Sequence, residues 1–262
     1  MAYIQIIQGI NILEIKVSVI TTTFQHPKWM LDRAIASVEG QRGVEYEHII
    51  INDTPTKNGM MRTYQEAFGR CAGDYIAFCD GDDYWIDSHK LEKQVEYMEN
   101  HHDCGLCITK VCEGDTSQSA FYAVGEMPSA EYVNKNMSFD SLLRGNAYIN
   151  AQSYLIRKSD FDKYINFDMF VKRFRLWDYP TVLELIQHTR IHCLDFYSAV
   201  NVINEESVTH TKSRLKRIRY LKDQYKVKWY YIRRYGCKPS TMIYLIYRAI
   251  RHIYSIGAKR WT

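Results

Sequence analysis

The chain has 262 residues, of which 46% are hydrophobic and 24% charged, and its formal net charge is +4. These are ordinary globular values, and they exclude a low-complexity or disordered chain. No stretch of about eighteen apolar residues occurs, so no membrane-spanning helix is predicted. The segment 1–16 lacks the basic start and apolar core of a secretory signal. Seven cysteines without framework spacing indicate reduced thiols in a cytoplasmic compartment.

Strands and helices are predicted to alternate along the first half of the chain. The pattern runs through a strand over 17–21, a helix opened by Pro27, a strand over 46–52, a helix over 59–70, a strand over 74–79, a helix capped by Asp87 or Ser88 and ending at Asn100, and a strand over 105–111. Such alternation predicts parallel pairing in a doubly wound α/β sheet. Ligands bind outside the carboxyl ends of the strands in sheets of this kind.

The third predicted strand ends in an acidic cluster at 80–83. Asp80 and Asp82 lie two residues apart, so an extended backbone points them to the same side. A hard divalent cation that also binds phosphate oxygens needs one or two such carboxylates. Asp-Gly and Asp-Asp are also common turn residues, so the cluster alone fits a solvated turn as well. Thr22 and Asp53 follow the other two strands, and this convergence at one edge favours a ligand site.

The cysteines at 104, 107 and 112, with His101 and His102, have some of the spacing of a zinc site. No second Cys-x-x-Cys completes the set, and the same stretch is predicted as a strand. We therefore expect packed thiols here.

Charge divides the chain near residue 210. The segment 212–262 holds fifteen Lys and Arg against one acidic residue, whereas the preceding residues hold nineteen against twenty-nine. We predict a main domain over 1–211 and a basic helical tail over 212–262. Apolar residues recur at helical spacing from Ile243 to Tyr254, and a basic amphipathic helix suits an anionic membrane surface.

Two other roles are open for this tail. Its apolar face could pack on the main domain, with the charges solvated. Basic residues interleaved with aromatics also suit nucleic acid. The acidic remainder of the chain shows no nucleic-acid motif, so nucleic acid is disfavoured as a partner.

Taken together, the motifs resemble those of the family 2 glycosyltransferases. The resemblance covers roughly 17–210 and rests on VSVITTTF (17–24), IIIND (49–53) and GDYIAFCDGDDYW (73–85), with weaker matches at 154–157, 177–180 and 207–210. It implies a GT-A fold, which is a Rossmann-like α/β structure with a mixed, mainly parallel sheet flanked by helices. It also implies inverting transfer of one sugar from a nucleotide-diphosphate sugar, expected to be a UDP-sugar, to a hydroxyl of a glycan or lipid-linked acceptor, as in bacterial surface polysaccharide assembly.

The resemblance further implies roles for single residues. The residues that would bind the nucleotide sugar are Thr22, Phe24, Asp53, Asp80 and Asp82. A Mn²⁺ or Mg²⁺ ion would be bound by Asp82, Asp83 and His210. Asp178 would act as the general base. Asp178 also fits a helix N-cap, because Tyr179 and Pro180 open an amphipathic helix, and both roles can coexist. Phe24 replaces the Tyr of many relatives. The Gln-x-x-Arg-Trp motif of processive synthases is absent, which indicates one sugar per encounter.

Two rival functions were weighed. A nucleotidyltransferase usually carries a Gly-rich basic loop after the first strand, and the segment 21–28 has none. A non-catalytic nucleotide- or nucleic-acid-binding module would lose Asp178 or the acidic cluster, and both are present. We therefore expect an enzyme in the cytoplasm, peripheral on the inner face of the cell membrane.

Overall fold

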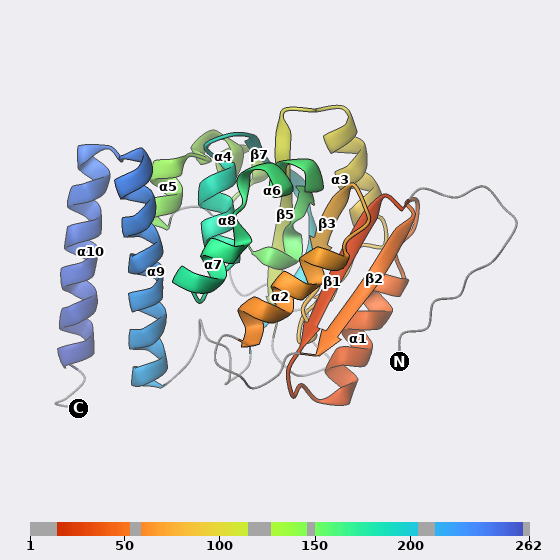
Figure 1. The fold of residues 1–262 in the computed structure, drawn as a ribbon, viewed down its shortest axis with the longest axis horizontal. Coiled ribbons are helices and arrows are strands. Elements are labelled where there is room, and N and C mark those ends of the chain that lie inside the picture. Colours follow the sequence, from red (N-terminus) through yellow and green to blue (C-terminus); the bar gives the residue numbers. More distant parts are fainter. Residues whose placement is uncertain (1–14, 53–58, 115–126, 146–149, 204–212, 259–262) are drawn as a thin grey trace, which may run out of the picture.

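The computed structural model describes residues 15–52, 59–114, 127–145, 150–203 and 213–258. The first elements are β1 (Val17–Thr23), α1 (Lys28–Glu39), β2 (Tyr46–Asn52), α2 (Gly59–Arg70) and β3 (Tyr75–Phe78). β1 lies between β2 and β3 and pairs with both in parallel (Figure 1). The alternating pattern predicted for this region is confirmed.

The remaining strands complete a seven-stranded sheet in the order β2-β1-β3-β6-β5-β7-β4. They are β4 (Tyr84–Trp85), β5 (Cys104–Gly114), β6 (Leu155–Arg157) and β7 (Arg190–Val202). The short strand β6 runs antiparallel to both of its neighbours, and β4 runs antiparallel to β7, whereas β5 and β7 are parallel. The sheet is therefore mixed, with as many antiparallel as parallel pairs among the described strands.

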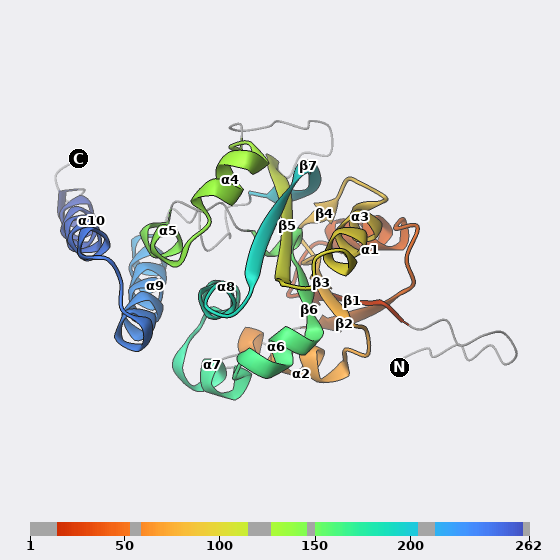
Figure 2. The same cartoon turned by 90° about the horizontal axis from the view of Figure 1, so that it is seen from above.

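Helices cover both faces of this sheet (Figure 2). Besides α1 and α2 they are α3 (Lys90–Glu99), α4 (Ala130–Asn136), α5 (Phe139–Arg144), the short 3-10 helix η1 (Ala151–Ser153), α6 (Lys158–Tyr164), α7 (Phe167–Arg173) and α8 (Asp178–Leu185). Alternate residues of β1 point to opposite layers, as the pleat requires. Val17 and Val19 join the core that includes residues of α1 and α3, whereas Ile20 joins the core that includes residues of α2 and α8.

Two local predictions are refined by the structure. The third helix begins at Lys90, later than the predicted cap. Asp87 stabilises the turn before it, since its carboxylate accepts from the His89 N–H at 2.8 Å and pairs with Lys93 at 2.6 Å. Cys104 and Cys107 are buried on β5, as expected for packed thiols. Burial raises the pKa of Cys104 to about 11.

The basic tail forms two helices, α9 (Arg214–Tyr235) and α10 (Pro239–Ala258), side by side at one end of the molecule (Figures 1 and 2). Val227 and Tyr231 of α9 are buried in the core shared with α2 and α8. Tyr235 donates to the buried Glu184 of α8 at 2.6 Å. The boundary near residue 210 thus marks a change of charge, while α9 belongs to the packed domain. None of the described helices is long and apolar enough to cross a bilayer.

Candidate active site

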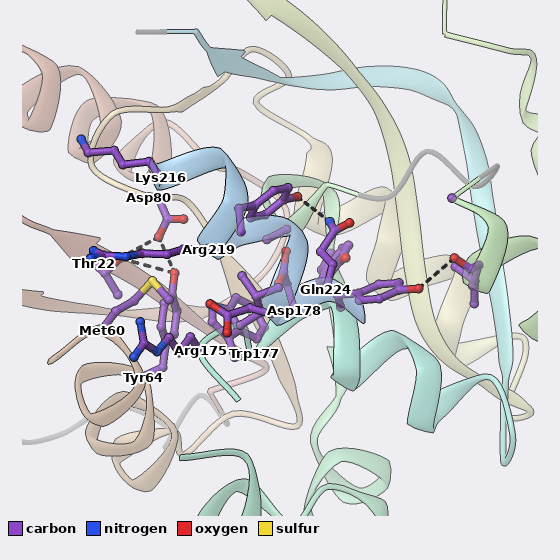
Figure 3. A pocket seen from close by; sticks show the side chains of 18 residues that line it. Thr22, Met60, Tyr64, Asp80, Arg175, Trp177, Asp178, Lys216, Arg219 and Gln224 are labelled. Atoms are coloured by element: carbon purple, nitrogen blue, oxygen red, sulfur yellow. Dashed lines mark hydrogen bonds between the residues drawn. The ribbon is translucent and has the colours of Figure 1, made fainter. Parts of the chain in front are cut away.

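A cavity of about 710 Å³ lies at the carboxyl ends of β1 and β3 (Figure 3). The strand ends contribute Thr22 and Asp80, α2 contributes Met60 and Tyr64, the start of α8 contributes Trp177 and Asp178, and α9 contributes Lys216, Arg219, Tyr220, Asp223 and Gln224. The cavity therefore occupies the sheet edge where the alternating pattern predicted a ligand site.

Asp80 is held in the cavity by two hydroxyl groups. Tyr64 donates to Asp80 Oδ1 at 2.6 Å, and Thr22 Oγ1 donates to the same oxygen at 2.8 Å. Within the described part of the chain, no hydrogen bond reaches Oδ2. Burial raises the pKa of Asp80 to about 6, with a further rise from Asp82 and an opposing effect of the two hydroxyl groups. One carboxylate oxygen is thus fixed by the protein, which orients the other for a ligand.

Tyr64 and Trp177 connect the two acidic positions of the cavity. The Tyr64 ring is 2% exposed, and its centroid lies 4.6 Å from that of Trp177. Trp177 in turn packs 4.5 Å from Phe78, the last residue of β3, and directly precedes Asp178. Sequence reasoning missed both aromatic residues, because a Tyr on the apolar stripe of a helix resembles an ordinary core residue.

Asp178 is the first residue of α8, while Trp177 occupies the N-cap position. Burial raises the pKa of Asp178, and the backbone N–H groups of Tyr179 and of Asp178 itself oppose this rise. The predicted N-cap role of Asp178 is therefore wrong, because Trp177 holds that position and no side-chain hydrogen bond caps the helix. The Asp178 side chain lines the cavity, so its position is compatible with the base role.

Asp83 is directed away from the cavity and into the sheet. It is 5% exposed; its Oδ1 accepts from the Val202 N–H at 2.8 Å, and its Oδ2 accepts from the Gln152 amide. Both oxygens therefore connect the acidic loop to β7 and η1. Each oxygen thus accepts one hydrogen bond from the protein, which gives Asp83 a structural role, and its metal role stays a prediction.

Asp82 lies beside the cavity, partly exposed. Its Oδ2 is 4.0 Å from His26 Nε2, and Arg33 donates to its backbone carbonyl at 3.5 Å. Among the described residues, no three His, Cys, Asp or Glu side chains gather in a way that could hold a metal ion. A cation at Asp82 would thus need oxygens from a ligand, as Mg²⁺ commonly does.

The remaining predicted site residues are Phe24, Asp53 and His210. Phe24 is 39% exposed and does not line the cavity. Asp53 and His210 lie outside the described residues. Their roles remain predictions.

The α9 wall adds positive charge that the sequence did not lead us to expect there. Lys216 and Arg219 line the cavity with Arg175, and within the described ranges none of the three forms an ion pair. In Figure 3 the Arg219 side chain extends toward the side of the cavity where Thr22 lies. These cations face the same space as Asp80 and Asp178, so the cavity suits a ligand that carries negative charge.

Comparisons with known proteins agree with this geometry. Residues 54–164 match the model of glycosyl transferase family 2. An uncharacterized protein of Mycobacterium bovis is 30% identical over 105 residues, which cover 39% of this chain and 28% of that protein. An uncharacterized glycosyltransferase of Methanocaldococcus jannaschii is 30% identical over 120 residues, covering 36% of this chain and 41% of that protein. The match thus spans less than half the length of either relative.

Solved structures show the same fold. Crystal structures of Staphylococcus aureus TarS (residues 1–349) superpose with a TM-score of 0.53 in complex with UDP-GlcNAc and 0.52 in complex with UDP. The identities are 13% and 14%; the first match covers 80% of this chain and 67% of TarS, and the second covers 87% and 73%. At these identities the likeness concerns the fold, which is GT-A. The segment 54–164 is therefore similar to family 2 glycosyltransferases, and the fold of the chain is similar to that of a GT-A glycosyltransferase.

Proposed function

We propose that this protein transfers a single sugar from a nucleotide-diphosphate sugar to an acceptor hydroxyl on a glycan or lipid-linked saccharide. The observation that carries the proposal is the placement of Asp80 and Asp178 on one cavity at the carboxyl ends of β1 and β3. A UDP-sugar is the donor class we favour, because the TarS structures that share this fold hold UDP-GlcNAc and UDP.

Asp178 acts as the general base in this scheme. Its raised pKa makes it a better proton acceptor than a solvated carboxylate. It takes the proton of the acceptor hydroxyl as that oxygen bonds to the anomeric carbon. The bond from that carbon to the diphosphate breaks, and its electron pair leaves with the diphosphate. One displacement inverts the anomeric centre, so no nucleophilic carboxylate is required.

The leaving diphosphate needs positive charge nearby. Asp82, with one carboxylate beside the cavity, fits a Mn²⁺ or Mg²⁺ ion that completes its coordination with phosphate oxygens and water. When bound, such an ion stabilises charge developing on the leaving group. Lys216 and Arg219 offer the same kind of stabilisation from α9. Asp80, oriented by Tyr64 and Thr22, accepts hydrogen bonds from the donor ribose.

The test is a panel of nucleotide-diphosphate sugars, assayed for release of nucleotide diphosphate with Mn²⁺ or Mg²⁺ and with chelator. We expect turnover with one donor class, lost in Asp178→Asn and kept in Asp195→Asn, whose exposed carboxylate pairs with Lys110 on the sheet. Failure of every nucleotide to bind would refute the proposed function. Equal donor affinity with metal and with chelator would refute only the metal.

A further inference from the structure

The outer face of α10 exposes a continuous stripe of large apolar side chains. Its members are Ile243, Ile246, Tyr247, Ile250 and Tyr254, which are between 54% and 78% exposed. Their spacing places them along one side of the helix. The opposite side carries the buried Thr241 and Leu245. The alternative in which the apolar face of the tail packs on the main domain is therefore wrong for these residues.

The helix that carries this stripe is anchored to the domain. Arg144 Nε of α5 donates to Thr241 Oγ1 at 2.9 Å. The Tyr225 hydroxyl of α9 lies 3.3 Å from His252 Nδ1 of α10. Both views show α10 as the outermost element at its end of the molecule (Figures 1 and 2). The stripe is thus held facing outward, and among the described residues nothing buries it.

Charge decides what kind of surface the stripe fits. Arg251 is exposed beside it and overlies the Tyr247 ring, whereas Arg248 lies toward the side of α10 that faces α9, where it overlies the Tyr244 ring. No acidic residue occurs in α10, and Asp223 is the only one in α9. A second copy docking through the same face would bring like charges together. An anionic surface with an apolar interior complements both features.

We propose that α10 docks this protein on an anionic lipid surface. The helix lies in the plane of the interface, with the Ile side chains at the acyl boundary and the Tyr rings at headgroup level. Arg251 pairs with a lipid phosphate. The inference does not depend on the proposed function, since docking needs no donor. Given that function, α9 would join the docked helix to the cavity and hold a lipid-linked acceptor near Asp178.

The experiment is cosedimentation of the full chain with vesicles of phosphatidylcholine alone and with part of it replaced by phosphatidylglycerol, at low and high salt. We expect binding to the anionic vesicles that weakens with salt. Removing the flanking cation in Arg251→Gln should lower the partition coefficient by about fivefold, from the usual contribution of a basic residue near an anionic surface. Ile246→Ser with Ile250→Ser should lower it by about tenfold or more at both salt concentrations.

Two matched variants control for general effects. Lys135→Gln removes an exposed cation on α4, and Ile86→Ser removes an exposed Ile after β4; neither should change the partitioning. Because the stripe residues are exposed, the variants should fold normally, which melting curves check. Absence of binding to anionic vesicles at low salt would overturn the proposal. So would tighter binding to single-stranded nucleic acid than to vesicles, or a lipid-free dimer that the stripe variants dissociate.

Discussion

Replacing Asp178 with Asn separates the chemistry at this position from its structural role. Asn keeps the size of the side chain and an acceptor oxygen near the helix N-terminus, but it cannot take a proton. General-base catalysis contributes about 10²-fold to 10⁴-fold, or about 3–5 kcal/mol of transition-state stabilisation. The interaction of a charge with a helix terminus contributes only about 0.3–1 kcal/mol. We therefore expect the transfer rate to fall by at least about 10²-fold, with a change in folding free energy of about 1 kcal/mol or less.

The pH dependence gives a second, independent readout. Burial raises the pKa of Asp178, so the base form is lost as the pH falls through that raised value. The wild-type transfer rate should show this acidic decline, and Asp178→Asn should lose the part of it that does not come from Asp80, whose pKa is also raised, to about 6. A raised carboxyl pKa also means that the folded protein binds this proton more tightly than the unfolded chain. Burying the charged carboxylate therefore lowers the stability of the folded protein at pH values above the folded pKa. The uncharged Asn variant removes this destabilisation at neutral pH.

The assay is single-turnover transfer at saturating donor, with donor affinity and melting temperature measured on the same samples. Asp195→Asn serves as the matched control. If Asp178→Asn transferred sugar at the normal rate, the base assignment would be refuted.

Three further predictions follow from the site. Tyr64→Phe removes the hydroxyl that donates to Asp80 at 2.6 Å. A hydrogen bond to a charged group contributes about 1.5–3 kcal/mol, so the donor affinity measured by calorimetry should fall by at least about tenfold. The control Tyr75→Phe loses an equally short hydrogen bond to Glu99 and should leave the donor affinity unchanged. Asp83→Ala leaves the buried Val202 N–H without its acceptor, so the free energy of unfolding measured in urea should fall by about 1–3 kcal/mol. If the variant instead lost metal affinity at unchanged stability, Asp83 would be a metal ligand. Arg219→Gln should weaken binding of the free nucleotide diphosphate more than that of the nucleoside, and equal weakening of both would contradict a phosphate role for α9.

Local sequence determined most of the framework. Buried strands such as 46–52 and amphipathic helices such as 59–70 are encoded by the spacing of apolar residues over a few turns, and the structure has both with the same bounds. The acidic residues after β3 were identifiable for the same reason, since carboxylates that follow a buried strand must lie at its carboxyl end. The charge of α10 and its apolar stripe were also predictable from the spacing alone.

Only the tertiary structure decided which of these side chains meet. Asp80 and Asp83 stand three residues apart, yet Asp80 faces the cavity while Asp83 binds the Val202 N–H of β7. Tyr64 contacts Asp80 and Trp177 through the packing of α2 against the sheet, and Lys216 and Arg219 reach the cavity because Val227 and Tyr231 bury α9 in the domain core. These contacts join residues far apart in the chain, and their energies depend on the whole packed core. Periodicity and charge count describe one segment at a time, so they could not select the partners.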